Sequence, residues 1–196
     1  MQTPKLADLL KLNSAFVLPA IPHIEDRVAE MREVARTSKV ERAIVVDRKT
    51  GGVLWRTNGE ATQVDVKPAY DAGLVQGNLI IHSHPVPAEL SLPDIQCVAM
   101  AKAYANMCVS FDGTCSWATT PAAIPGLTPD ILEAMAGVAR EECGFQPYDD
   151  KDVHFAHTCA CDNYWIADKV RSYLIPRGYT WNTFYGDVAL SNMTKE

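Results

Sequence analysis

Apolar and polar residues alternate with two different periods along the first part of the chain. From residue 24 to residue 39 the apolar residues recur every three or four positions, with acidic residues near the start and basic residues near the end. This pattern predicts an amphipathic helix whose charges suit its dipole. Residues 41–47 and 53–57 are rich in β-branched and apolar side chains and residues 61–66 alternate, so a meander of three strands is expected next.

The following segments continue this mixture of periods. Pro68 opens a short helix that should reach about residue 75, and an apolar strand is expected over residues 78–83. A helix capped by Ser91 should extend to about residue 106, followed by a hairpin over 107–118 that turns at Asp112-Gly113. This order of elements predicts an α/β (α+β) fold, in which helices flank a mixed central sheet.

Two prolines near residue 120 mark the expected domain boundary. Residues 1–120 form the predicted core, including an N-terminal arm in which prolines at 19 and 22 oppose a continuous helix. Residues 121–196 form a predicted C-terminal extension that is rich in helix and packs on the core. Its expected elements are two helices and an edge strand, at residues 128–142, 162–174 and 179–185.

Composition narrows the class of protein. The chain has 196 residues, of which 47% are apolar and 21% charged, and no run approaches the roughly 18 apolar residues of a membrane span. The net charge of −6, with no basic block, argues against a nucleic-acid partner. The N-terminus lacks a secretory signal pattern, so a cytoplasmic location is expected, and the six scattered cysteines are expected to be reduced thiols.

The candidate chemistry lies where the apolar strand 78–83 ends. His82 and His84 are two residues apart and therefore point to the same side of an extended strand. Asp94 would join them from the first turn of the helix that Ser91 caps. Two histidines and one aspartate leave a fourth tetrahedral position for water, which is the composition of a catalytic zinc site. A lone His-x-His is more often a surface or hydrogen-bonded pair, but the strand, the proline turn and the capped helix favour the metal site.

Hydrolysis at such a site also needs a carboxylate that moves protons without binding the ion. Glu41 is the preferred candidate, because it begins the first strand of the sheet and could reach the end of a neighbouring strand. The alternative for Glu41 is a solubilising acid at a strand edge. The remaining candidates are a set of acids elsewhere in the core, Glu25, Glu30, Glu33, Glu60 and Glu89.

Together, Glu41, the sequence His82-Ser83-His84-Pro85 and the pair Ser91-x-x-Asp94 resemble the signature of the JAMM/MPN+ (JAB domain) metalloproteases, over roughly residues 40–120. The resemblance implies a cytidine-deaminase-like core with Zn²⁺ on the two histidines and the aspartate. It also implies that Glu41 acts as general acid and base and that Ser91 steadies the tetrahedral intermediate. The implied reaction is hydrolysis of a peptide or isopeptide bond, often one to a ubiquitin-like protein.

One spacing departs from this signature. Six residues separate His84 from Ser91, where the family usually has seven, so the loop is tighter and the substrate groove should differ more than the metal site. The tighter loop and the C-terminal extension suggest a bacterial or phage member.

Three functions remain open at this point. The leading one is a zinc peptidase or isopeptidase that acts on a protein or peptide substrate. The others are a catalytically idle domain that binds a partner protein, and a zinc hydrolase with a non-peptide substrate. The sequence leaves the oligomeric state open.

A second group of metal-binding residue types occurs in the extension. It consists of two histidines three residues apart and two cysteines two apart, His154, His157, Cys159 and Cys161. Their spacing fits no common zinc-finger pattern, so packed thiols and hydrogen-bonded histidines are the favoured interpretation. A second zinc site, or a lining for the groove of the first site, is the alternative.

Overall fold

The computed structural model describes residues 6–61, 63–86, 88–119, 171–172, 174–187 and 190. Its strands are β1 (Arg42–Val46), β2 (Val53–Asn58), β3 (Leu79–His84), β4 (Ala105–Ser110), β5 (Cys115–Thr119) and β6 (Thr180–Phe184). Its helices are α1 (Leu6–Ala15), α2 (Ile24–Thr37), α3 (Lys67–Asp71) and α4 (Leu92–Ala101), with a 3-10 turn at Ile175–Arg177.

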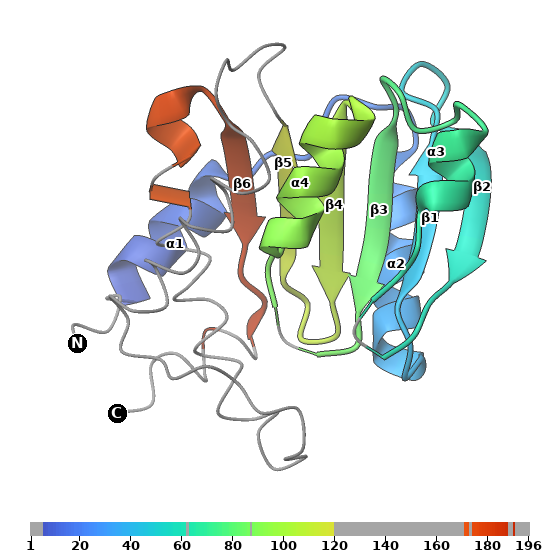
Figure 1. The fold of residues 1–196 in the computed structure, drawn as a ribbon. Coiled ribbons are helices and arrows are strands. Elements are labelled where there is room, and N and C mark those ends of the chain that lie inside the picture. Colours follow the sequence, from blue (N-terminus) through green and yellow to red (C-terminus); the bar gives the residue numbers. More distant parts are fainter. Residues whose placement is uncertain are drawn as a thin grey trace, which may run out of the picture.

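The six strands form one mixed sheet in the order β2-β1-β3-β4-β5-β6 (Figure 1). Only β3 and β4 run parallel, and α4 connects them, because parallel neighbours need a crossover connection. The other neighbouring pairs are antiparallel. The expected mixed sheet with flanking helices is therefore confirmed.

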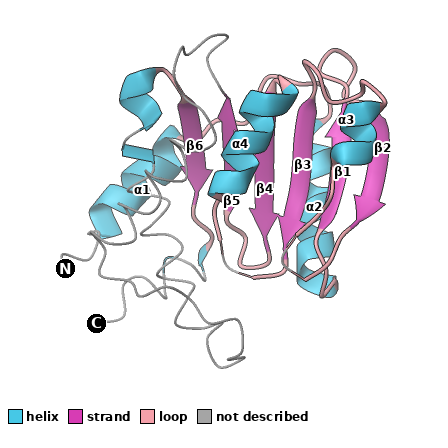
Figure 2. Cartoon of the chain, viewed as in Figure 1, coloured by secondary structure: helices cyan, strands magenta, loops and turns pink. Residues whose placement is uncertain are grey.

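Strand periodicity divides the core between the two faces of the sheet. Ile81 and Leu79 of β3 pack with Met31 of α2 on one face. Ile80 points to the other face, where it packs with Val98 of α4 and with Ala69 of α3. Figure 2 shows α3 and α4 in front of the sheet and α2 behind it. His82 and His84 have the same parity as Ile80, so the fold directs them to the α4 face.

The two ends of the described chain meet at the β6 edge of the sheet. The Asn13 side chain of α1 donates to the Tyr185 carbonyl over 2.9 Å and accepts from the Tyr185 N–H over 2.7 Å. The rings of Phe16 and Phe184 contact each other in a tilted arrangement, with centroids 5.8 Å apart. The expected edge strand at 179–185 is confirmed as β6, and α1 ends before Pro19, as the prolines require.

Three predicted elements differ from the structure. The expected third strand at 61–66 is wrong for the residues described there, 61 and 63–66, because the chain turns back after Gly59, where the Glu60 N–H donates to the Gln63 carbonyl over 2.7 Å. The helix expected up to about residue 106 ends at Ala101, and Lys102 takes a left-handed conformation with φ of 51° before β4 begins. The short helix expected over 68–75 covers only Lys67–Asp71.

Other expectations fall partly or wholly outside the described residues. These include the helices at 128–142 and 162–174 and the group His154, His157, Cys159 and Cys161. Three of the six cysteines are described, and all three are free thiols, Cys97, Cys108 and Cys115. Within the described ranges, no helix combines the length and the apolar character that a membrane crossing requires.

Candidate metal centre

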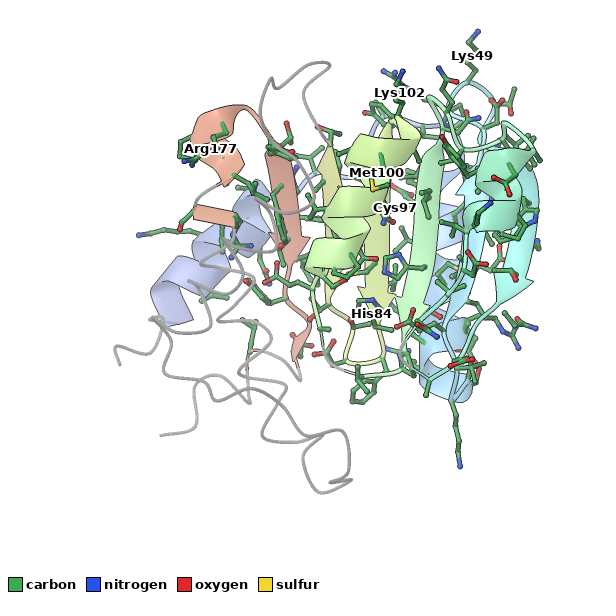
Figure 3. The ribbon with its side chains drawn as sticks, viewed as in Figure 1. Lys49, His84, Cys97, Met100, Lys102 and Arg177 are labelled. Atoms are coloured by element: carbon green, nitrogen blue, oxygen red, sulfur yellow. The ribbon has the colours of Figure 1, made fainter. Side chains whose placement is uncertain are left out.

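Two buried histidines form the centre of the candidate site. His82 and His84 lie at the carboxyl end of β3, with 2% and 6% of their surface exposed. Figure 3 labels His84 at this end of the strand. Their Nε2 atoms are 2.9 Å apart, and their rings meet edge to face with centroids separated by 4.7 Å. The shared direction expected from their spacing is therefore present in the sheet.

Asp94 reaches the same point from the first turn of α4. Its Oδ1 lies 3.3 Å from His82 Nε2. Its Oδ2 accepts from the Ser91 hydroxyl over 2.6 Å and from the Ser91 N–H over 2.7 Å, which completes a capping box at the start of the helix. The predicted N-cap is thus confirmed, and the Ser91 hydroxyl holds one carboxylate oxygen while the other faces the histidines.

Asn106 of β4 is a site residue that the sequence did not reveal. Its side-chain oxygen lies 3.2 Å from His82 Nδ1, and its amide nitrogen donates to the Asp94 carbonyl over 3.2 Å. The second bond fixes which way the amide points, so Nδ1 of His82 is the donor in the first. This leaves Nε2 of His82 to face the cluster, as a metal-binding histidine requires. No motif marks this residue, because only the parallel pairing of β3 and β4 brings it to the histidine.

The ionisation of the cluster follows from burial and from the charges of neighbouring groups. Burial disfavours charge on His82, but the charge of Asp94 and its hydrogen bond outweigh burial and raise the pKa of His82. Burial, and then the charge of His82, lower the pKa of His84 to about 4. The two shifts thus favour the charged form of His82 and the neutral form of His84, whose Nε2 atoms are 2.9 Å apart.

The carboxylate of Asp94 stays ionised. Burial acts to raise the pKa of Asp94, but the charge of His82 and the hydrogen bond to it hold that pKa well below its usual range. A negative oxygen and two ring nitrogens thus converge on one point. The point favours positive charge, whether a proton or a metal cation supplies it.

The spacing of these atoms fits a metal ion. One donor atom from each of His82, His84 and Asp94 lies within 4.8 Å of the other two. Ligand atoms placed tetrahedrally at about 2.0–2.1 Å from zinc are about 3.3 Å apart. His82 Nε2 lies at similar distances from His84 Nε2, 2.9 Å, and from Asp94 Oδ1, 3.3 Å. The three residues could therefore hold a metal ion with small adjustments of their side chains.

Glu41 lies beside this cluster without joining it. Its Oε1 is 3.9 Å from His84 Nε2, and only 7% of the residue is exposed. The antiparallel register pairs Ala43 with His82, so Glu41, two residues earlier, falls opposite His84. Burial raises the pKa of Glu41 to about 7, the positive charge of His82 opposes the rise, and Asp94 adds to it. The carboxyl is thus balanced between its two protonation states near neutral pH.

The other candidate acids lie elsewhere. Glu25, Glu30 and Glu33 belong to α2, on the opposite face of the sheet from the histidines, and Glu60 is exposed. Glu89 is buried, but its carboxylate is bonded to residues near and in β6. Of the six acids considered, the fold brings only Glu41 to the histidines.

Comparisons of this chain with protein-family models, with curated proteins and with solved structures found no match. The site therefore has to be interpreted from its own residues and geometry.

Proposed function

We propose that this protein is a zinc-dependent hydrolase of the JAMM/MPN+ type, which cleaves a peptide or isopeptide bond. The observation that carries the proposal is the position of Glu41. A buried carboxyl with a pKa of about 7 lies 3.9 Å from one of three converging side chains that could hold a metal ion. A buried carboxyl group with a strongly raised pKa is typical of a functional site and is not expected beside a His-x-His pair on the surface.

The chain's own residues would divide the work as follows. His82, His84 and Asp94 would hold Zn²⁺, which when bound acidifies a water molecule and polarises a carbonyl group. Asn106 orients His82, and Ser91 holds the carboxylate of Asp94. Glu41, which lies beside the three side chains without joining them, would take a proton from the attacking water and deliver it to the leaving amine.

The substrate class rests on the resemblance of the motif to the JAMM/MPN+ family. A protein or peptide substrate is proposed, including conjugates of ubiquitin-like proteins. The mixed sheet with α4 between β3 and β4 is compatible with the core that the family would require. The net charge of −6 argues against a nucleic-acid substrate.

The test compares wild type with Glu41→Gln on a panel of peptides and ubiquitin-like conjugates, with zinc content measured on the same samples. Glu41→Gln should retain zinc and lose turnover by a factor of about 10²–10⁴, because only the proton carrier is removed. His84→Ala should lose both zinc and turnover. Glu60→Gln is the matched control, since Glu60 is exposed and its backbone neighbours Glu41.

Two outcomes would contradict the proposal. If His84→Ala retains its zinc, the assignment of the ligands is wrong. If wild type binds zinc but no substrate distinguishes it from Glu41→Gln, a catalytically idle binding domain becomes the better explanation.

A further inference from the structure

Glu89 carries a buried carboxyl group and lies, in the sequence, between the two histidines and the Ser91–Asp94 pair of the candidate metal site. It lies five residues after His84 and two before Ser91, in the connection from β3 to α4. Its side chain is 0% exposed. An ionised carboxylate can stay so deeply buried only when charged or hydrogen-bonding partners compensate for the loss of water.

Among the described residues, the hydrogen-bond donors to this carboxylate come from the C-terminal part of the chain. Oε2 accepts from the Thr183 hydroxyl over 2.6 Å, from Arg171 Nη1 over 3.1 Å and from Trp181 Nε1 over 3.2 Å. Oε1 accepts from the Tyr185 hydroxyl over 2.6 Å. Burial, and then the charge of Glu89, raise the pKa of Tyr185, so the phenol keeps the proton that it donates. We name these five residues the Glu89 clasp.

The backbone on either side of Glu89 is held as well. The Ala88 N–H donates to the Ser110 hydroxyl over 3.3 Å, and the Ser110 hydroxyl in turn donates to the Ala88 carbonyl. The Leu90 N–H donates to the Ser116 hydroxyl over 3.1 Å. Residues 88–90 therefore lie bonded across β4 and β5 while the Glu89 side chain points towards β6.

We propose that Glu89 is a positioning residue of the metal site, and that the clasp makes the placement of Asp94 depend on the segment from Arg171 to Tyr185. The inference rests on the proposed metal site. Without its donors the carboxylate would have to reach water, which would pull residues 88–90 off β4 and β5. Ser91 follows Leu90 directly and holds Asp94, so the displacement would reach the third ligand while β3 still holds the two histidines.

A merely structural role for the clasp makes a different prediction. In that case its loss would lower stability throughout the molecule and leave the geometry of the folded metal site unchanged. The two roles can be separated by cobalt(II), whose visible absorption reports the number and arrangement of its ligands independently of any enzymatic activity.

The experiment uses the full chain with the paired substitutions Thr183→Val and Tyr185→Phe. These remove the two shortest bonds to Glu89 and the two bonds that Arg171 donates to the same hydroxyls. The ion pair between Arg171 and Glu89 and the Trp181 bond to Glu89 stay in place, so the fold should survive. The single variant Thr183→Val provides a milder second test. Asn13→Ala is the matched control, because it removes two hydrogen bonds to the Tyr185 backbone and none to the loop.

If Glu89 positions Asp94, the paired variant should bind cobalt(II) less tightly than wild type, on the order of tenfold, which is the loss seen when residues that hold metal ligands are replaced in other proteins. Its cobalt absorption bands should also be weaker and shifted. Thr183→Val should change both readouts in the same direction by a smaller amount. Asn13→Ala should lower the melting temperature and leave both readouts at wild-type values.

Two results would overturn the inference, and they are distinguishable. If wild type binds no cobalt, the metal site and the proposed function fail together. If wild type binds cobalt and the two clasp variants match Asn13→Ala in affinity and spectrum, only the positioning role of Glu89 fails.

Discussion

Replacing Asn106 with alanine would remove the side chain that fixes both His82 and the backbone of Asp94. Asn106 is 2% exposed, and each of its two bonds measures 3.2 Å. The buried His82 Nδ1 would lose its partner at a cost of about 1–3 kcal/mol, and the partly buried Asp94 carbonyl at a cost of about 1 kcal/mol. The free energy of unfolding should therefore fall by about 2–4 kcal/mol.

The effect of Asn106→Ala on the metal is the more specific expectation. The ring of His82 would be free to rotate or to change tautomer, so zinc affinity should fall by about 10- to 100-fold, equivalent to about 1.4–2.7 kcal/mol. The assay is competition with a chromogenic chelator, combined with denaturant unfolding of the metal-free protein.

Asn78 provides a matched control at the other end of β3. Its Oδ1 accepts from the Arg48 N–H over 3.1 Å, and its Nδ2 donates to the Leu74 carbonyl over 2.9 Å. Asn78→Ala therefore also removes one accepted and one donated hydrogen bond, away from the histidines, and it should lower stability by about 1–2 kcal/mol with zinc affinity unchanged. The reasoning would be refuted if Asn106→Ala lost stability but bound zinc as tightly as Asn78→Ala.

Two further predictions concern the helix cap and a glycine turn. Ser91→Ala should lower the free energy of unfolding by about 1 kcal/mol and weaken zinc binding about tenfold, because the hydroxyl that holds Asp94 Oδ2 over 2.6 Å is lost. Ser91→Thr should preserve both in thermal melts and chelator competition, whereas loss of turnover alone in Ser91→Ala would favour a direct role of the hydroxyl in catalysis. Gly51→Ala should cost about 2–5 kcal/mol, because an alanine Cβ would lie 1.8 Å from the Pro22 carbonyl oxygen at a φ of +71°. The control is Gly73→Ala, at a φ of +73° with nothing within 4 Å of the added Cβ, which should lower the free energy of unfolding by only about 1–2 kcal/mol in denaturant unfolding. If both variants lose the same free energy of unfolding, the close contact of Gly51 with Pro22 contributes nothing.

The sequence was most informative where a property is local. The period of two in β3 placed His82 and His84 on one side, and the Ser91-x-x-Asp94 pattern placed a carboxylate in the first turn of α4. Both features depend on backbone geometry over fewer than two helical turns. Local signals failed at residues 61–66, where the alternation was correct for a strand but the turn after Gly59 excluded one.

The tertiary structure decided every contact between distant parts of the chain. Glu41 was chosen from six acids by a plausible reach, and it is the antiparallel register of β1 on β3 that brings it to His84. Asn106 and the Glu89 clasp carry no local pattern at all. They depend on β4 lying parallel to β3 and on β6 joining the far edge of the sheet.

The sequence by itself thus determined the candidate ligands, the strand and helix that carry them, and the cap that orients Asp94. Tertiary structure determined that the Glu41 carboxyl lies beside the histidines and that the Glu89 carboxyl is bonded to residues in and next to β6. The physical reason is that periodicity and capping depend on neighbours along the chain. The burial and ionisation of a side chain depend instead on the residues that the strand order brings around it. Glu41 and Glu89 are chemically identical in the sequence, and only their surroundings separate a candidate proton carrier from an anchor.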